Sequence, residues 1–262
     1  FYPSGAIKLK GCYKNFLQQG LFCEYFEDGH ESLKLEYDQG KKVGELVEYY
    51  PNHQIKTCWH FQEDKFHGPQ KQWHENGQLM METNYQHGKR EGAYTTWSAS
   101  GDLLLKTFYK NDLLEGEYVS FFPSGSKQEE AFYKNGKPEK WQTVYFENGK
   151  LNSKFFYVDG LYDGENISYF EDGSIQFIRH FDKGVAIGKQ EEYYPKSRWL
   201  DPKNPQLARV FMYDETGRMH GPQKTFYPNG TLQTVISYEL GELHGLKALW
   251  DEQGNLLEES TF

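Results

Sequence analysis

The sequence lacks the features that would build a membrane-spanning helix or a disulfide framework. No run of about 18 or more apolar residues occurs in the chain, so no segment is expected to cross a membrane as a helix. Its three cysteines, Cys12, Cys23 and Cys58, are an odd number in a chain of 262 residues. We therefore expect free thiols, with a Cys12–Cys23 bond across one hairpin as the weaker alternative.

Basic residues are also fewer than acidic ones, with 29 Lys and Arg against 38 Asp and Glu. The net charge is −9 and the isoelectric point is about 5.5, which argues against a nucleic-acid-binding protein, because such a surface needs a basic stripe to neutralise phosphates. An acidic surface would suit a basic partner. Solubility alone also explains the acidity, and it is the interpretation that we favour.

The first residues, Phe1 to Gly5, do not resemble a signal peptide. Because the chain has no initiator Met and begins inside a repeat, we expect that an N-terminal segment preceded it, and that any targeting signal lay there. The predicted location is the cytoplasm, with the periplasm as the alternative.

Aromatic residues, by contrast, make up 17% of the chain. Tyr, Phe and Trp are strand formers that pack on a pleated surface, so we expect rings to build the core of an all-β protein. The sequence also repeats every 24 residues, with a turn glycine at phase zero. These glycines are Gly5, Gly29, Gly77, Gly101, Gly125, Gly149 and Gly173, with His53 in the vacant slot, and Gly230 and Gly254 after a slip of nine residues.

Each repeat has the same order of rings and turns. A ring stands four residues before each turn position, and turn tetrads such as Phe122-Pro123-Ser124-Gly125 suit a tight turn. After the turn, an aliphatic residue and a later ring have the even spacing of one strand face. A second turn follows, and then a glycine that recurs through the array, with Lys140 as the exception.

The predicted fold is an all-β, elongated, solenoid-like meander of tandem antiparallel β-hairpin repeats of 24 residues. Residues 1–262 are expected to form a single repeat domain of ten or eleven hairpins, the first and last incomplete. An insertion near residues 198–210 interrupts the register, and a tolerated surface loop is its simplest explanation.

The segment Tyr145-Phe146-Glu147-Asn148-Gly149-Lys150-Leu151, continued by Tyr157, Gly160, Gly164 and Tyr169, resembles the MORN-repeat-variant family. Bacterial members of this family are often labelled YwqK-type antitoxins. The resemblance implies an array of β-hairpins and an antitoxin or immunity role, in which the protein binds a cognate toxin and blocks it. The matching rings and glycines build the framework, so no catalytic residue is carried over.

The sequence contains no recognisable catalytic, cofactor-binding or metal-binding motif. His53, His60, His67 and His74 are seven residues apart, but on a meander they fall on different strands and turns. His-Glu-x-x-His, Cys-x-x-Cys and phosphate-binding glycine motifs are absent. We therefore predict a protein that is not an enzyme and that uses no cofactor and no metal.

Specificity in a repeat protein usually lies in positions that vary between repeats. The residue before the second framework ring becomes phenylalanine in mid-array, and strand alternation is expected to bring Tyr94 and Tyr118 to the same side. The candidate partner-binding residues are His60, Tyr94, Phe108, Tyr118, Phe132, Phe156, His180 and, beside the insertion, Trp199. Aromatic anchors with a polar margin are typical of an interface. The alternative is a second core layer, in which these rings pack on one another.

The leading functional prediction is a bacterial immunity protein or antitoxin that neutralises a cognate toxin by direct protein–protein binding. One alternative is a structural scaffold without a toxin partner. Another is a carbohydrate-binding or cell-wall-binding repeat protein, although that function favours regularly spaced exposed tryptophans, and the six tryptophans here are scattered.

Overall fold

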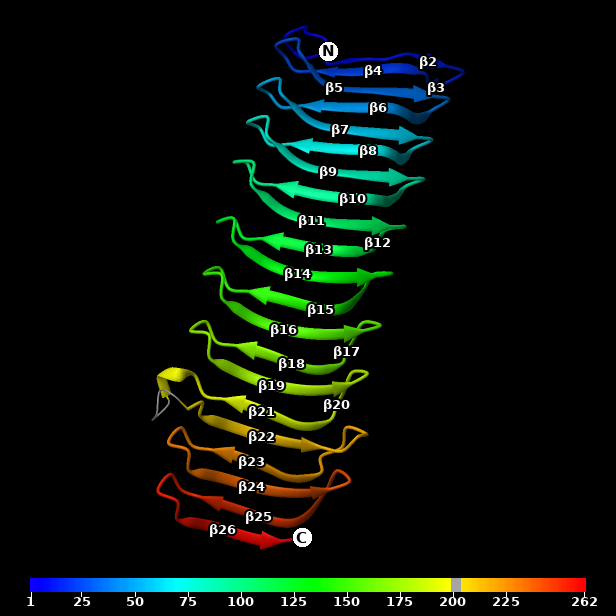
Figure 1. The fold of residues 1–262 in the computed structure, drawn as a ribbon. Coiled ribbons are helices and arrows are strands. Elements are labelled where there is room, and N and C mark those ends of the chain that lie inside the picture. The colour runs from blue at the N-terminus through cyan, green and yellow to red at the C-terminus, as the bar shows by residue number, and fades with distance from the viewer. Residues whose placement is uncertain (199–203) are drawn as a thin grey trace. The chain divides into compact units, whose positions relative to one another are not determined.

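The computed structural model describes residues 1–198 and 204–262, which form two compact units (Figure 1). Unit 1 contains residues 1–126 and 133–136, and unit 2 contains residues 127–132 and 137–262. Apart from a short 3-10 helix, η1 (Lys196–Arg198), every regular element of the described residues is a strand. No helix in this part of the chain is long and apolar enough to cross a membrane. The all-β prediction is confirmed.

In unit 1 the strands pair with their sequence neighbours as an open antiparallel meander, apart from a small separate β2–β3 hairpin. The strands are β1 (Leu9–Lys10), β2 (Tyr13–Lys14), β3 (Leu17–Gln18), β4 (Gly20–Tyr25), β5 (Glu31–Asp38), β6 (Lys41–Tyr49), β7 (Ile55–Gln62), β8 (Lys65–Trp73), β9 (Leu79–Gln86), β10 (Lys89–Trp97), β11 (Leu103–Lys110), β12 (Leu113–Leu114) and β13 (Gly116–Phe121). β14 (Lys127–Lys134) carries residues of both units.

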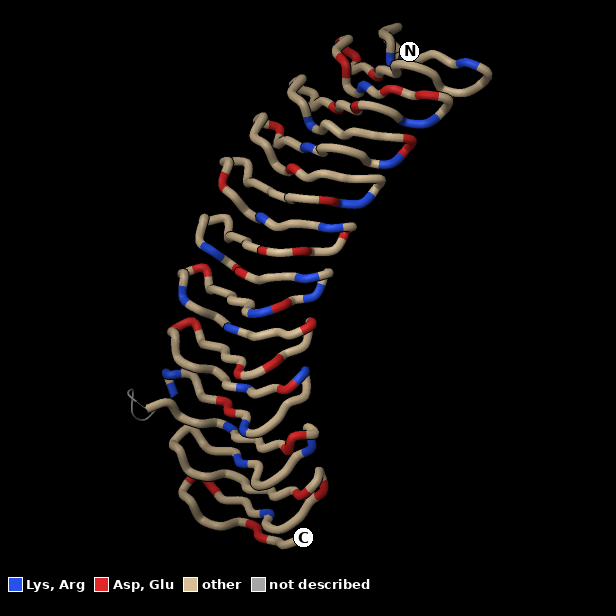
Figure 2. Tube along the Cα trace, turned by 45° about the vertical axis from the view of Figure 1, so that its right-hand side comes forward, with Lys and Arg blue, Asp and Glu red and all other residues tan. Residues whose placement is uncertain are grey.

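Unit 2 has the same antiparallel meander. Its strands are β15 (Lys137–Tyr145), β16 (Leu151–Val158), β17 (Leu161–Tyr162), β18 (Gly164–Tyr169), β19 (Ile175–Asp182), β20 (Val185–Ala186), β21 (Gly188–Tyr193), β22 (Leu207–Tyr213), β23 (Gly221–Phe226), β24 (Leu232–Glu239), β25 (Glu242–Trp250) and β26 (Leu256–Thr261). In each unit, basic and acidic residues are interspersed along the strands and turns (Figure 2).

The ring before each turn lies at a register shift in its strand. In β6 the pairing with β7 shifts between Glu48 and Tyr49, and the same shift recurs at Trp73, Trp97 and the equivalent rings of unit 2. The turn that follows is tight, and His53, in the vacant glycine slot, adopts a φ of 68° and donates its backbone N–H to the Tyr50 oxygen at 2.8 Å. The repeat phase read from the sequence therefore locates both the bulge and the turn.

Side chains in the turns also bond one repeat to the next. The Tyr50 hydroxyl donates to the Trp73 backbone oxygen at 2.9 Å, and the Asn52 amide donates to the Glu75 oxygen at 2.8 Å. The spacing of 23 residues recurs in other repeats. Across the insertion, Tyr194 makes the equivalent bond to the Phe226 oxygen at 2.8 Å, although these residues are 32 apart. The framework contact is thus kept on both sides of the insertion.

A second irregularity lies near the recurring glycine, where a buried side-chain amide completes the backbone hydrogen bonding. Gln70 is 0% exposed, accepts from the His60 backbone N–H at 3.1 Å and donates to the His60 oxygen at 3.0 Å. Gln190 bonds His180 in the same way, and Gln223 bonds Met212. We call the sheet face that carries these side chains the amide face, and the other the opposite face.

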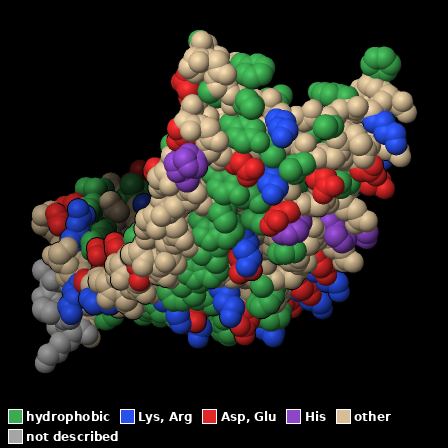
Figure 3. Space-filling view, turned by 90° about the horizontal axis from the view of Figure 1, so that it is seen from above, with side chains coloured by type: hydrophobic (Ala, Val, Ile, Leu, Met, Phe, Trp, Pro, Cys, Tyr) green, Lys and Arg blue, Asp and Glu red, His purple; other side chains and the backbone are tan. Residues whose placement is uncertain are grey.

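The most buried residues lie in the middle of the strands, and many of them are small or polar. Gln70, Thr107 and Asn166 are the largest fully buried side chains among the described residues, whereas the framework rings are half-buried. Figure 3 shows hydrophobic side chains gathered in a band on the visible face, with charged side chains and histidines among and beside them. The expectation of a core made of rings is therefore only partly met. The framework rings stay half-buried because no second layer of structure covers the sheet that carries them. The three cysteines are free thiols.

Candidate binding surface

Two of the predicted partner-binding residues lie on the face opposite to the one expected. Tyr94 pairs in register with Thr83 and Thr107, whereas Phe108 pairs with Ala93. Paired residues project to the same side of a sheet, so Tyr94 lies on the amide face and Phe108 on the opposite face. The Tyr94 ring packs edge-on against Tyr109 at 5.7 Å, and burial raises the pKa of its hydroxyl. Its role is therefore framework packing.

Tyr118 follows the same pattern. Its ring packs against Tyr133 at 5.8 Å, edge to face, and its neighbour Ser120 pairs with Leu105 on the amide face. Strand alternation alone gave the wrong side for Tyr94 and Tyr118, because the side also depends on the register between strands. Phe108 stays a candidate on the opposite face of unit 1, where it is 39% exposed.

In unit 2, the predicted residues Phe132 and Phe156 lie beside an exposed tryptophan that the sequence analysis did not select. Trp141 is 44% exposed and pairs with Phe156 across β15 and β16, with ring centroids 5.0 Å apart. The Lys154 ammonium lies 4.3 Å from the Trp141 ring centroid, and the Lys140 ammonium lies 4.2 Å from that of Phe132. We call Phe132, Lys140, Trp141, Lys154 and Phe156 the Trp141 patch.

The backbone at this patch departs from the repeat. Lys140 occupies the position of the recurring glycine and adopts a φ of 65°, a left-handed conformation that glycine takes without steric cost. In an earlier repeat, a Cβ placed on Gly68 would lie 3.7 Å from the His60 Cβ. The equivalent side chain of Lys140 lies against Phe132. A strained residue that carries an exposed cation against the Phe132 ring is a feature expected of a functional surface rather than of the framework.

His60 and His180 occupy equivalent positions, one in each unit, and both rings are held by the backbone. Nδ1 of His60 lies 2.7 Å from the Pro69 oxygen, and Nδ1 of His180 lies 2.8 Å from the Lys189 oxygen. Nε2 of His180 also lies 3.4 Å from Glu165. Both histidines lie on the opposite face, as predicted, but they are half-buried and fixed. Trp199, the remaining predicted residue, lies outside the described residues.

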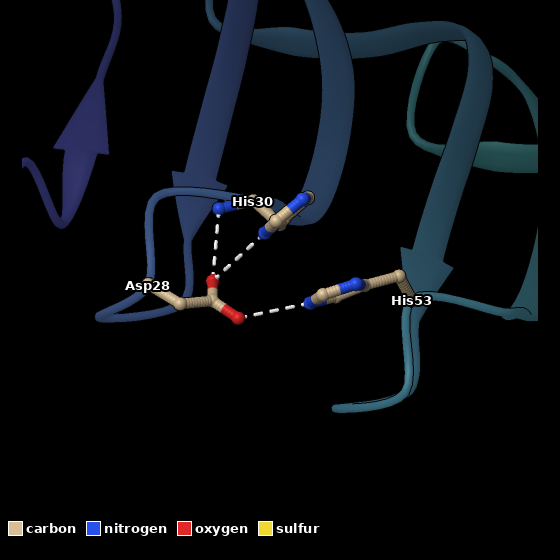
Figure 4. Close-up of side chains that lie close together, drawn as sticks. All are labelled: Asp28, His30 and His53. Carbon is tan, nitrogen blue, oxygen red and sulfur yellow. Dashed lines mark hydrogen bonds and ion pairs between the residues drawn. The ribbon is translucent and has the colours of Figure 1, made fainter.

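Two groups of side chains in unit 1 have a composition suited to metal binding. The first joins neighbouring turns: Nε2 of His53 lies 2.9 Å from Asp28, Nδ1 of His30 lies 3.3 Å from the same carboxylate, and the two rings stack at 3.7 Å (Figure 4). The backbone N–H of His30 and the His53 ring lower the pKa of Asp28 to about 2. All three residues are exposed. Because Asn52 and Asn76 bond their turns as Asp28 does, this group is largely turn chemistry.

The second group, Glu45, Cys58 and His60, lies on β6 and β7. The Cys58 thiol donates to the Glu45 carboxylate at 2.7 Å, and burial followed by this carboxylate raises the pKa of Cys58 to about 12. The thiol is therefore protonated near neutral pH and is a weak nucleophile. The sequence analysis missed both groups because their members meet across strands and turns rather than along one motif.

A hollow on the amide face of unit 2 was also missed. It has a volume of about 380 Å³ and is lined by rings that include Phe177 and Tyr193. Arg179 stacks on Phe177 at 4.2 Å and contacts Glu192 at 3.1 Å, while Arg209 lies 3.6 Å from Glu192. Other repeats have small or apolar residues, such as Thr107 and Ala131, at the position of Arg179. This change of residue type is the feature of the sequence from which the hollow could have been predicted.

Six segments match the model of the MORN repeat variant: residues 66–87, 90–111, 114–135, 142–159, 162–183 and 219–239. These six segments are therefore similar to a repeat that is generally a protein-binding or membrane-binding motif. A comparison with curated proteins gives no match.

Two solved structures have a weak likeness to the chain. One is a Photorhabdus luminescens Tc holotoxin pore, with 10% identity, a TM-score of 0.21 and coverage of 97% of this chain and 17% of that one. The other is the complex TcdB2-TccC3-Cdc42, with 9% identity, a TM-score of 0.18 and coverage of 94% and 15%. The chain thus spans a small part of both. At these TM-scores the likeness carries no argument about fold or function.

Proposed function

We propose that the protein binds another protein through the Trp141 patch. The observation that carries this proposal is the exposed Trp141 ring, which stands beside Phe156 and under the Lys154 ammonium, next to the strained Lys140. Tryptophan and other rings surrounded by charged side chains are the usual centres of binding energy in protein interfaces. Three other repeats carry glutamate at this position, Glu45, Glu117 and Glu165, and none of the rest has an aromatic ring there, so folding does not require one.

The more specific form of the proposal is that the protein is a bacterial immunity protein or antitoxin, which binds a cognate toxin and blocks its action. The support is the similarity of six segments to this type of repeat, together with the exposed Trp141 patch and a sequence without a recognisable catalytic motif. We further propose that the protein has no enzymatic activity of its own and acts in the cytoplasm.

The test is the substitution Trp141→Glu, which restores the residue found in other repeats. Full-length wild-type and W141E proteins are immobilised and offered lysate of the native host, and captured proteins are identified by mass spectrometry and then measured with purified partner. We expect the affinity for that partner to fall at least about 30-fold, corresponding to the loss of roughly 2 kcal/mol at an interface centre.

The matched control is Leu246→Glu, because Leu246 occupies the equivalent repeat position, is exposed and lies far along the chain on β25. L246E should bind as the wild type does, and both variants should keep the β-sheet circular dichroism spectrum. Equal binding by wild type and W141E would refute the patch. A captured protein without toxic activity in the host would refute the immunity role while leaving protein binding intact.

A further inference from the structure

Glu45, Cys58 and His60 form a compact group of three different metal-ligand side chains on the opposite face of unit 1. Each offers one ligand atom, and the three atoms lie within 4.8 Å of one another. Glu45 on β6 pairs directly with His60 on β7, and Val47 pairs with Cys58, so the ladder between adjacent strands fixes their spacing (Figure 1). We propose that these three side chains bind one Zn²⁺ ion.

The ligand types suit zinc. Zn²⁺ is bound in proteins by thiolate, imidazole and carboxylate groups, and a site with three protein ligands keeps a fourth position for water. Calcium and magnesium prefer oxygen ligands and would not favour a thiol. A thiolate and a carboxylate would together balance the two positive charges of the ion. The Cys58 thiol already points at Glu45, with the sulfur 2.7 Å from a carboxylate oxygen, so the metal would take the place of the proton between them.

The histidine is oriented for this role by the backbone. Nδ1 of His60 lies 2.7 Å from the Pro69 carbonyl oxygen, which as an acceptor selects the tautomer with hydrogen on Nδ1. Metal-bound histidines usually hold their second nitrogen in this way, because the contact fixes the ring and its tautomer. Gln70 further holds the His60 backbone on both its N–H and its carbonyl. Nε2 of His60 is then the nitrogen left to bind the ion.

The equivalent position in unit 2 supports this orientation. His180 holds Nδ1 against the Lys189 oxygen at 2.8 Å and turns Nε2 toward Glu165 at 3.4 Å. Glu165 and His180 are paired across β18 and β19, as Glu45 and His60 are across β6 and β7. Cys58 is replaced there by Ile178, which stands 120 residues later at the same phase. The chain therefore contains one copy of the site with a thiol and one without it.

The surroundings of the group leave the ion accessible. Lys71 pairs with Cys58 in register, but its ammonium is engaged by Glu82 at 3.0 Å. Val47, on the other side of Cys58, adds an apolar wall. Cys58 and His60 are half-buried and Glu45 is exposed, so an ion could enter from solvent past the carboxylate. The other candidate group, Asp28, His30 and His53, is more exposed and has no thiol.

Cobalt gives a direct readout of this geometry, because Co²⁺ takes the place of Zn²⁺ and a cobalt–thiolate bond produces an intense charge-transfer absorption. The experiment uses the full chain with Cys12→Ser, which removes the exposed thiol and serves as the parent. Co²⁺ titration is followed by absorption, and Zn²⁺ affinity is measured by competition with a chromophoric chelator. We expect one equivalent of metal and a charge-transfer band.

The matched variant is Cys58→Ile, which installs the residue of the equivalent repeat and should fold. It should lose the band and bind Zn²⁺ at least about 100-fold more weakly, since even the loss of a supporting partner costs up to that factor. Glu45→Gln, a near-isosteric change on the exposed side, should weaken binding with the band retained. His53→Gly, which removes a ligand of the other group and restores the turn glycine, should change neither the band nor the affinity.

No charge-transfer band in the parent, or equal Zn²⁺ affinity in the parent and C58I, would overturn the proposal. A loss of stoichiometric binding in H53G with C58I unaffected would place the metal at the turn group instead and would equally refute it. None of these outcomes depends on the Trp141 patch, which belongs to unit 2.

Discussion

At the scale of single residues, the departures from the repeat carry the chemistry. Framework positions show little change of type, whereas three residues depart from their counterparts: Lys140 stands where the other repeats have glycine, Trp141 where several have glutamate, and Cys58 where one has Ile178 and others have lysine or glutamate. Lys140 adds a cation, Trp141 adds a ring and Cys58 adds a thiol, each at a position where other repeats form the same sheet without that group. Such residues can therefore be exchanged for the residue of a neighbouring repeat without removing a framework contact.

Lys140 provides a test of backbone strain. Glycine adopts a φ of 65° freely, whereas an alanine there keeps the steric cost and loses the contact with Phe132. We expect Lys140→Gly to be more stable than Lys140→Ala by about 1 kcal/mol in urea denaturation. At Lys154, whose backbone is an ordinary strand, the order should reverse, with Ala above Gly. An alanine variant at Lys140 as stable as the glycine variant would show that the backbone is not strained.

At the scale of the turn and the strand, side chains form hydrogen bonds with backbone N–H and carbonyl groups that have no partner in the neighbouring strand. Asp28 is one example in a turn, and Gln70 is another at the irregular pairing between β7 and β8. The repeat phase predicts where the turns fall, but it does not predict the irregular pairing between β7 and β8 or the side chains that satisfy the open backbone groups.

The Asp28 carboxylate gives a pH-dependent prediction. Its pKa is lowered to about 2 by the His30 backbone N–H first and then by the His53 ring. A lowered folded-state pKa means that the contribution to stability is present above the usual value of about 4 and is lost as the pH falls through about 2. NMR titration of the Asp28 carboxyl carbon should give a midpoint near 2. In His53→Gly the midpoint should rise part of the way, while that of Asp214, held by Thr216 and Arg218, stays unchanged.

Gln70 tests the hydrogen bonding at the strand irregularity. In Gln70→Leu the His60 N–H and carbonyl lose their partners inside the sheet, which should cost about 2–4 kcal/mol of unfolding free energy. Gln72 lies on the same strand and is half-buried, so Gln72→Leu should cost much less. Chemical denaturation of the two variants measures the difference. Equal losses would mean that burial, rather than the amide contact, decides the cost.

At the scale of the whole molecule, the sequence predicted the meander well because the repeat is local. Period, turns and the insertion all follow from residues within one repeat and its neighbour, and Tyr194 and Phe226 keep their contact across the insertion. The face of Tyr94 was wrong because it depends on pairing between strands. The Glu45, Cys58 and His60 group and the Arg179 hollow were missed because their members converge only after the strands are aligned.

The contacts that join residues 23 apart, such as the one from Tyr50 to Trp73, recur in successive repeats and also limit how a chain of this kind can change length. When one whole repeat is added or deleted, each turn side chain again meets a backbone oxygen of the same kind in the next repeat. The array can therefore be lengthened or shortened by whole repeats without the loss of these hydrogen bonds. Any other change of length must be absorbed between a turn and the next strand, as at the insertion. A spare repeat is then free to acquire a cysteine or a tryptophan, so new binding chemistry can arise while the ancestral framework is retained elsewhere.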